Sequence, residues 1–255
     1  MGKVIAIANH KGGVAKTTTA INFGAALVNL GRKVLLVDMD PQCNLTETLY
    51  GGEYEDSVYT GMLSGEPFRV LPIKPGFDVL PGDKGLLYAD VKLSGEEYAG
   101  RAQRLLRDGL DGLRDAYDFI IIDCPPSRGI ITVNALAAAD EVIIPTLAEI
   151  LAVRGIKDMN ELIGLVRAEL NPKLTLAGLL LVMHGDRTTA AKITSVYIAD
   201  IAGYIGTKLF ATRIRKNVAV VESQMAQKDV FETNPAAKAA QDYLQLAREY
   251  LGIAG

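Results

Sequence analysis

The stretch that decides the fold is residues 4–19, with the sequence VIAIANHKGGVAKTTT. Its first five residues are apolar and predict a buried strand, and residues 20–30 follow as a predicted helix. The order strand, glycine-containing turn, Lys-Thr and helix is typical of a loop that binds a phosphate chain, because free backbone N–H groups and the helix dipole meet there. In such a loop Lys16 reaches the β- and γ-phosphates of a nucleotide, and the Thr17 hydroxyl binds Mg²⁺.

Length and composition narrow the class of protein. The chain has 255 residues, of which 49% are hydrophobic and 22% charged, as in ordinary globular proteins. No linker or repeat divides it, so we expect a single domain over residues 1–255. The net charge is −3, so any contact with nucleic acid must come from a local basic patch.

The same composition favours a cytoplasmic protein. Cys43 and Cys124 lie far apart in the sequence, which indicates neither a disulfide framework nor a zinc site. The apolar run at residues 4–8 is too short for a signal peptide, and no run approaches the ~20 residues of a membrane span. We therefore expect no stable association with a membrane.

Acidic residues follow two further apolar runs. Asp38 and Asp40 come directly after residues 34–37, and Asp123 follows residues 119–122. Wholly apolar strands joined by helices predict a parallel sheet covered on both faces, whose ligand chemistry lies at the carboxyl ends of its strands. An Asp in the position of Asp123, paired with a phosphate loop, has the Walker B role of positioning Mg²⁺.

The rest of the chain predicts more elements of the same kind. The predicted fold class is α/β, a P-loop NTPase with a mostly parallel, twisted sheet flanked by helices on both faces. Residues 43–97 are expected to form loops and short helices around two short strands. Further strands are expected at 141–145, 174–183 and 209–212, and helices at 98–117, 130–139, 150–169, 189–204, 217–225 and 235–251.

The phosphate loop departs from the ordinary pattern G-x-x-x-x-G-K-[ST] at His10 and Ala15. Lys11 stands instead before Gly12 and Gly13, and this arrangement resembles the deviant Walker A box, K-G-G-x-G-K-[ST], of the ParA/MinD family of ATPases. Ala15 departs even from that box. If the position requires a positive φ, its methyl group costs about 1 kcal/mol or more.

Beyond this loop the resemblance covers nearly the whole chain. The order of the loop, Asp-Met-Asp-Pro-Gln at 38–42 and Ile-Ile-Ile-Asp-Cys-Pro-Pro at 120–126 resembles the partitioning ATPases called ParA or Soj. The resemblance implies an ATPase with Mg²⁺ that forms a homodimer with ATP and partitions or positions plasmid or chromosomal DNA. It also implies non-specific DNA binding, slow hydrolysis until a ParB-like partner stimulates it, and a nucleoid-associated location in the cytoplasm.

The resemblance also implies roles for single residues. Lys11 would reach the ATP of the partner subunit, and Asp40 would orient the attacking water, so the implied catalytic set is Lys11, Lys16 and Asp40. Asp38 would support Mg²⁺, with Thr17 and Asp123 as the other metal-site residues, partly through water. The implied ATP-binding residues are Lys11, Gly12, Gly13, Val14, Ala15, Lys16, Thr17, Thr18 and Asn217.

A basic surface for DNA is implied in the second half of the chain. Residues 212–219 occupy the place of the family's I-P-R-N-V-R stretch, with Arg215 at the proline, Lys216 at the first arginine and Ala219 at the second. The predicted DNA contacts are Arg187, Lys192, Arg213, Arg215 and Lys216. The alternative is that these are scattered, solvated charges on a net-acidic protein.

Three other functions are compatible with the same motifs. One is a MinD-like regulator at a membrane, which needs a basic amphipathic C-terminal helix; residues 242–251 contain Asp242 and Glu249 against a single Arg. Another is ParA-like positioning of a cargo other than DNA. The third is a metabolic ligase or kinase that transfers the phosphoryl group to a second substrate.

Overall fold

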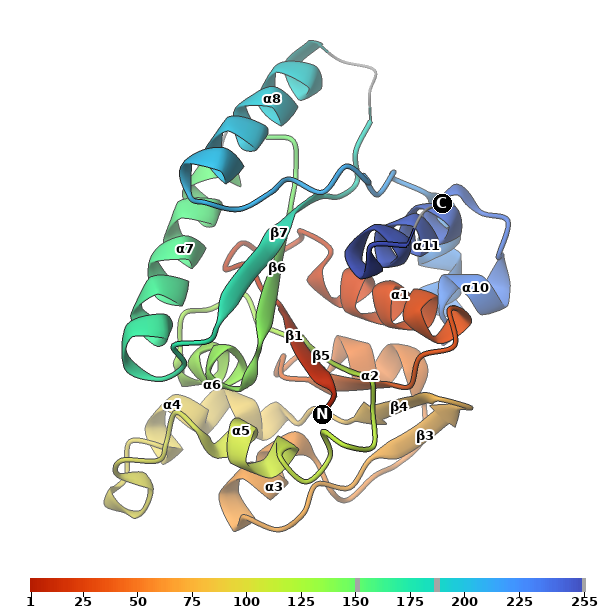
Figure 1. Ribbon diagram of the computed structural model, residues 1–255. Helices are drawn as coiled ribbons and strands as arrows, with labels where there is room; N and C mark the ends of the chain where they lie inside the picture. The colour runs from red at the N-terminus through yellow and green to blue at the C-terminus, as the bar shows by residue number, and fades with distance from the viewer. Residues whose placement is uncertain (150–151, 186–188, 254–255) are drawn as a thin grey trace.

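The computed structural model describes residues 1–149, 152–185 and 189–253. Over these residues the chain forms a seven-stranded sheet in the order β3-β4-β2-β5-β1-β6-β7, with helices on both faces (Figure 1). All neighbouring strands are parallel except β3 and β4. The predicted fold class is confirmed.

The strands match the apolar runs of the sequence. Their bounds are β1 Lys3–Ile7, β2 Val34–Asp38, β3 Leu71–Lys74, β4 Phe77–Leu80, β5 Phe119–Asp123, β6 Glu141–Thr146 and β7 Thr175–Leu181. In the central strands β1, β2 and β5 nearly every residue is buried, as expected for strands covered on both faces.

The helices alternate with the strands and pack on both sides of them. Their bounds are α1 Lys16–Asn29, α2 Asn44–Leu49, α3 Val58–Ser64, α4 Ala89–Lys92, α5 Leu105–Leu110, α6 Ile130–Ala138, α7 Ala152–Glu169, α8 Thr189–Tyr204, α9 Val218–Met225, α10 Val230–Thr233 and α11 Lys238–Leu251, with 3₁₀ helices η1 Lys84–Tyr88 and η2 Glu96–Tyr98. Helices α1, α2 and α11 cover one core, and α3 to α8 cover the other.

The helix predicted over residues 98–117 is wrong. The structure has only α5 within that range, with turns on both sides. The left-handed backbone of Gly100, with a φ of 77°, interrupts the helix on its N-terminal side. The apolar spacing of the segment therefore comes from one short helix and its flanking turns, and not from a continuous helix.

Both edges of the sheet are modified. At one edge β3 runs antiparallel to β4 and contains Pro72. At the other, the backbone N–H of Leu179 donates to Lys208 O over 2.8 Å, and Ile214 N–H donates to Leu181 O over 2.9 Å. The strand predicted at 209–212 is replaced by an isolated bridge between Leu209 and Leu179 of β7.

Candidate nucleotide site

The loop between β1 and α1 contains two residues with left-handed backbone. Gly13 has a φ of 72°, and Ala15 has a φ of 55° and a ψ of 36° as the residue that precedes α1. The carbonyl oxygen of Ala15 accepts a hydrogen bond from Thr19 N–H over 2.9 Å, which starts the helix. An alanine in this region costs about 1–2 kcal/mol relative to a right-handed conformation, because its Cβ crowds the backbone.

We expect Ala15→Gly to stabilise the nucleotide-free protein by roughly 0.5–1 kcal/mol, because glycine adopts a positive φ without this clash. For a chain of this length the melting temperature would rise by about 1–4 °C. Gly13→Ala is the matched control: nothing lies within 4 Å of its added Cβ, so it should lower the melting temperature through φ alone. Equal melting temperatures for Ala15→Gly and wild type would contradict the assignment of strain to Ala15.

The site brings a buried ammonium and a buried carboxylate together. Lys16 and Asp123 are 8% and 0% exposed, and Lys16 Nζ donates to Lys11 O over 3.3 Å. Burial lowers the pKa of Lys16, while the charge of Asp123 opposes this shift. Burial also raises the pKa of Asp123 well above its ordinary value, with a further contribution from the Asp38 charge. A phosphate chain would place negative charge beside Lys16, and a divalent cation would place positive charge beside Asp123, so each would favour the charged form of the group.

Asp38 and Asp40 have separate partners. The Asp38 carboxylate accepts from Thr46 N–H over 2.9 Å, Thr46 Oγ1–H over 2.7 Å and Asp40 N–H over 3.2 Å. Asp40 Oδ1 accepts from Gln42 N–H over 3.0 Å. Since Asp38 pairs with Asp123 across β2 and β5, the three carboxylates gather at one edge of the sheet, as the sequence predicts.

The residues present fit a magnesium ion. Both carboxylate oxygens of Asp123 are buried without a hydrogen-bond partner among the described residues, and the Thr17 hydroxyl favours their charged form. No cluster of three His, Cys, Asp or Glu side chains that could hold a metal occurs in the described part of the chain. Mg²⁺ commonly binds through one or two protein oxygens plus substrate phosphates and water, which is the set that Asp123 and Thr17 offer.

Lys11 has an acidic partner in its own chain. Its Nζ lies 2.8 Å from Glu149 Oε2, and the two side chains are 32% and 54% exposed. An exposed pair of this kind contributes little to stability, so Lys11 can exchange Glu149 for a phosphate. Glu149 was missed by the sequence reasoning, although it follows β6 closely and the rule that identified Asp38 and Asp123 applies to it as well.

A hollow of about 390 Å³ lies beside the phosphate loop. Asn217 lines it together with Ala15 and Thr18, so the structure brings Asn217 close to the loop. Its Oδ1 accepts from Ala219 N–H over 2.9 Å and caps α9. The apolar lining residues Met183, Val218 and Val221 are exposed.

The predicted DNA contacts have different surroundings. Lys192 and Lys216 are exposed, whereas Arg215 makes a two-pronged ion pair with Asp242, with Nη2 2.6 Å from Oδ1 and Nε 2.9 Å from Oδ2. Arg213 Nη1 lies 3.1 Å from His184 Nε2. Arg187 lies outside the described residues.

Comparisons with known proteins agree with this geometry. Residues 2–176 match the AAA_31 family, described as an AAA domain. The chain is 41% identical over 249 residues to the chromosome-partitioning ATPase Soj of Thermus thermophilus, covering 97% of this chain and 94% of the relative. It is 37% identical over 255 residues to the sporulation initiation inhibitor protein Soj of Bacillus subtilis, covering 98% of each.

A solved structure with a similar fold contains a bound nucleotide. It is cobyrinic acid a,c-diamide synthase from Mycobacterium smegmatis with a bound ATP analog and magnesium, with a TM-score of 0.81 and 34% identity over 97% of this chain and 93% of that one. No helix in the described part of this chain has the length and apolar character needed to cross a membrane.

Proposed function

This chain belongs to the Soj/ParA family of ATPases, and on that premise we propose that ATP joins two copies into a dimer that binds DNA non-specifically. A ParB-like partner then stimulates hydrolysis and releases the DNA, so that a plasmid or chromosome is partitioned at the nucleoid in the cytoplasm. The observation that carries the proposal is the convergence of Lys11, Lys16 and the buried Asp123 carboxyl at one edge of the sheet.

The proposed chemistry is phosphoryl transfer to water. The loop of residues 9–15 and Lys16 bind the phosphates, and Thr17 and Asp123 would hold Mg²⁺, which supplies positive charge to the phosphate oxygens when it is bound. Asp40 positions the attacking water. Such a site works by placing groups and charges in advance of the reaction, so its rate depends on how completely the groups are assembled.

The hollow beside the loop is proposed to receive the adenine of ATP. A volume of about 390 Å³ lies within the ~300–1,000 Å³ usual for small-molecule sites. Apolar side chains would cover the faces of the base, and the Asn217 amide supplies a polar group for its edge. Lys11, partly exposed in the single chain, would leave Glu149 and reach the ATP of the partner subunit.

The proposal is tested by comparing wild type with Lys16→Ala. With Mg²⁺ and ATP, wild type should double its mass in light scattering and release phosphate, whereas Lys16→Ala should do neither. Phosphate release from ATP and water alone would also count against a ligase or kinase that needs a second acceptor. A wild-type protein that neither dimerises nor hydrolyses ATP beyond the Lys16→Ala level would overturn the proposal.

The membrane alternative has less structural support. The apolar face of α11, with Tyr243 and Leu246, is buried in the core against α1, so that face is not available to lipid. Co-sedimentation with liposomes or with DNA, each with ATP, separates the two functions. Positioning of a cargo other than DNA would show ATP-dependent dimers that bind DNA but are stimulated by a protein unrelated to DNA segregation.

We expect Lys192→Glu to bind non-specific DNA more weakly while keeping basal hydrolysis, because a phosphate-neutralising charge is lost. The slope of log affinity against log salt should fall by about 1. Arg215 is left unchanged because its loss would leave the largely buried Asp242 carboxylate without this ion-pair partner. Lys92→Glu on α4, at the end of the molecule opposite α8 (Figure 1), is the matched control. An unchanged slope would place the DNA surface elsewhere.

A further inference from the structure

Contacts between three side chains link the phosphate loop to the loop that follows β5. Each carboxylate oxygen of Asp158 on α7 lies near one of the other two: Oδ2 is 3.1 Å from His10 Nε2, and Oδ1 is 2.7 Å from Arg128 Nη2. His10 directly precedes Lys11, and Arg128 stands five residues after Asp123. One carboxylate therefore contacts both loops that hold the groups of the nucleotide site.

Helix α7 is fitted closely to the phosphate loop at the same place. A Cβ on Gly155, one turn before Asp158, would lie 3.2 Å from Asn9 Oδ1 and 3.7 Å from His10 Cε1. The Asn9 side chain in turn accepts from Lys11 N–H over 3.0 Å and donates to Pro145 O over 2.8 Å. The turn before Lys11 is thus held through Asn9 on one side and through His10 on the other.

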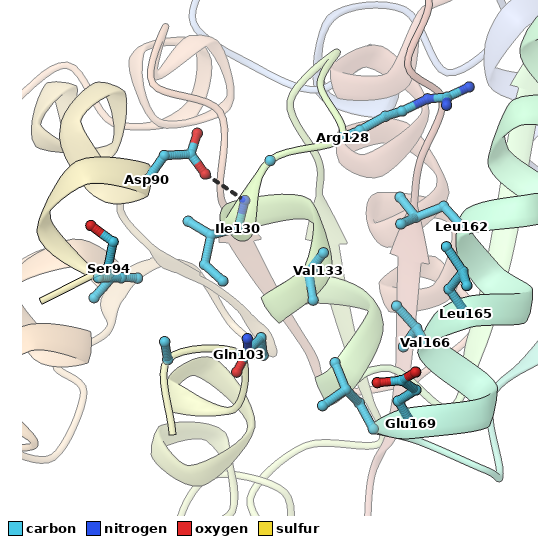
Figure 2. A pocket seen from close by; sticks show the side chains of 14 residues that line it. Asp90, Ser94, Gln103, Arg128, Ile130, Val133, Leu162, Leu165, Val166 and Glu169 are labelled. Carbon is cyan, nitrogen blue, oxygen red and sulfur yellow. Dashed lines mark hydrogen bonds between the residues drawn. The ribbon is translucent and has the colours of Figure 1, made fainter. Parts of the chain in front are cut away.

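Arg128 is the most exposed of the three side chains in this chain of contacts. It lies at the rim of a groove of about 680 Å³ that is lined by residues of α4, α6 and α7. Figure 2 shows its guanidinium extending away from Val133 and Gln103, two other lining residues of the groove. The hydrogen bond from Arg128 holds the pKa of Asp158 below its ordinary value, so the carboxylate stays charged at neutral pH.

We propose that Asp158 is a positioning residue for the ATPase, which preassembles the phosphate loop by holding His10 and Arg128 at a fixed separation. The inference rests on ATP binding at residues 9–19 and does not require DNA binding or partition. The three side chains are 21–48% exposed, and pairs at such sites contribute little to global stability. Their effect should therefore be seen in ATP affinity and not in the melting temperature.

The test measures the affinity of each variant for Mg²⁺-ATPγS by calorimetry, together with its melting temperature. Asp158→Asn has one acceptor oxygen in place of two and carries no charge, so we expect an affinity roughly 5- to 20-fold weaker with the melting temperature unchanged. The single-turnover rate at saturating ATP should stay within about two-fold of wild type, because the reacting groups remain in place once ATP has ordered the loop. Glu161→Gln, an exposed carboxylate on the same helix, is the matched control.

Two variants at the other end of the contact separate positioning from a general loss of structure. His10→Ala should weaken ATP binding as much as Asp158→Asn, and the double variant should be no weaker than either single one. His10→Gln keeps a side-chain N–H donor and should recover most of the affinity. Asp158→Asn with wild-type affinity, or losses that simply add, would overturn the inference; a wild-type protein without ATP binding would instead refute the proposed function.

Discussion

Asp123→Asn is expected to raise the melting temperature of the nucleotide-free protein while abolishing Mg²⁺-dependent ATP hydrolysis. The Asp123 carboxyl is fully buried, neither of its oxygens has a hydrogen-bond partner among the described residues, and burial disfavours its charged form. An amide carries no charge, so the desolvation cost of the carboxylate, about 1–3 kcal/mol, is removed. For this chain length that corresponds to roughly 2–12 °C. The same change removes the anionic oxygens that fit Mg²⁺, so hydrolysis should fall to the level of Lys16→Ala.

The control for this variant is Asp200→Asn, an exposed carboxylate on α8, which should change neither quantity. A lower melting temperature for Asp123→Asn would mean that the carboxylate contributes to the fold in a way the structure does not show. Hydrolysis near the wild-type rate would remove Asp123 from the proposed magnesium site.

The pH dependence of stability gives a second measurement on the same carboxylates. Burial raises the pKa of Asp38 from 3.8 to about 6, and the pKa of Asp123 is raised as well. The folded protein therefore holds these protons more tightly than the unfolded chain. The stabilising contribution of the Asp38 proton is complete below pH 3.8 and is lost as the pH rises through about 6, and that of the Asp123 proton declines in the same direction. Asp123→Asn should make this decline in the free energy of unfolding smaller.

The second large effect is expected for Asp40→Ala, which should bind ATP and dimerise but hydrolyse ATP at least ~100-fold more slowly. Loss of a group that positions or deprotonates the attacking water costs typically 10²–10⁴-fold. The Asp40 side chain also accepts from Gln42 N–H, so the loss could have a structural origin.

Asp40→Asn separates the two origins, because its amide oxygen can still accept from Gln42 N–H but cannot serve as a base. Both variants should be equally slow in single-turnover hydrolysis while retaining ATP affinity. Recovery of hydrolysis in Asp40→Asn would make the role structural, and loss of ATP binding in Asp40→Ala would refute the assigned role.

The central part of the fold could be predicted because its information is local. Apolar runs of four or five residues each end in a polar group, and parallel strands bring such ends to one edge. This reasoning placed Lys16, Asp38 and Asp123 together, and the structure does so through the pairing of β1, β2 and β5. The segment around α5 could not be predicted, because its apolar spacing fits a continuous helix although Gly100 adopts a left-handed backbone that interrupts one.

Contacts between side chains that lie far apart in the sequence could not be predicted either. Arg215 and Asp242 are 27 positions apart, and only the folding of α11 onto α1 brings them together, so the charge of Arg215 could not be recognised as already paired. Likewise His10, Arg128 and Asp158 come from three separate elements, and the spacing of residues gives no sign of their contact. Glu149 is the exception, because its position shortly after the predicted strand at 141–145 could be read from the sequence.

The two modified edges of the sheet affect whether copies of this protein can associate by pairing their edge strands. An open strand edge is a template on which another chain can add a strand, and such pairing often leads to aggregation. Here Pro72 interrupts hydrogen bonding in β3, and residues 208–214 already occupy donors and acceptors of β7. Continuous growth from sheet to sheet is therefore disfavoured even at high local concentration. The ATP-dependent dimer that we propose would therefore form through surfaces other than the sheet edges.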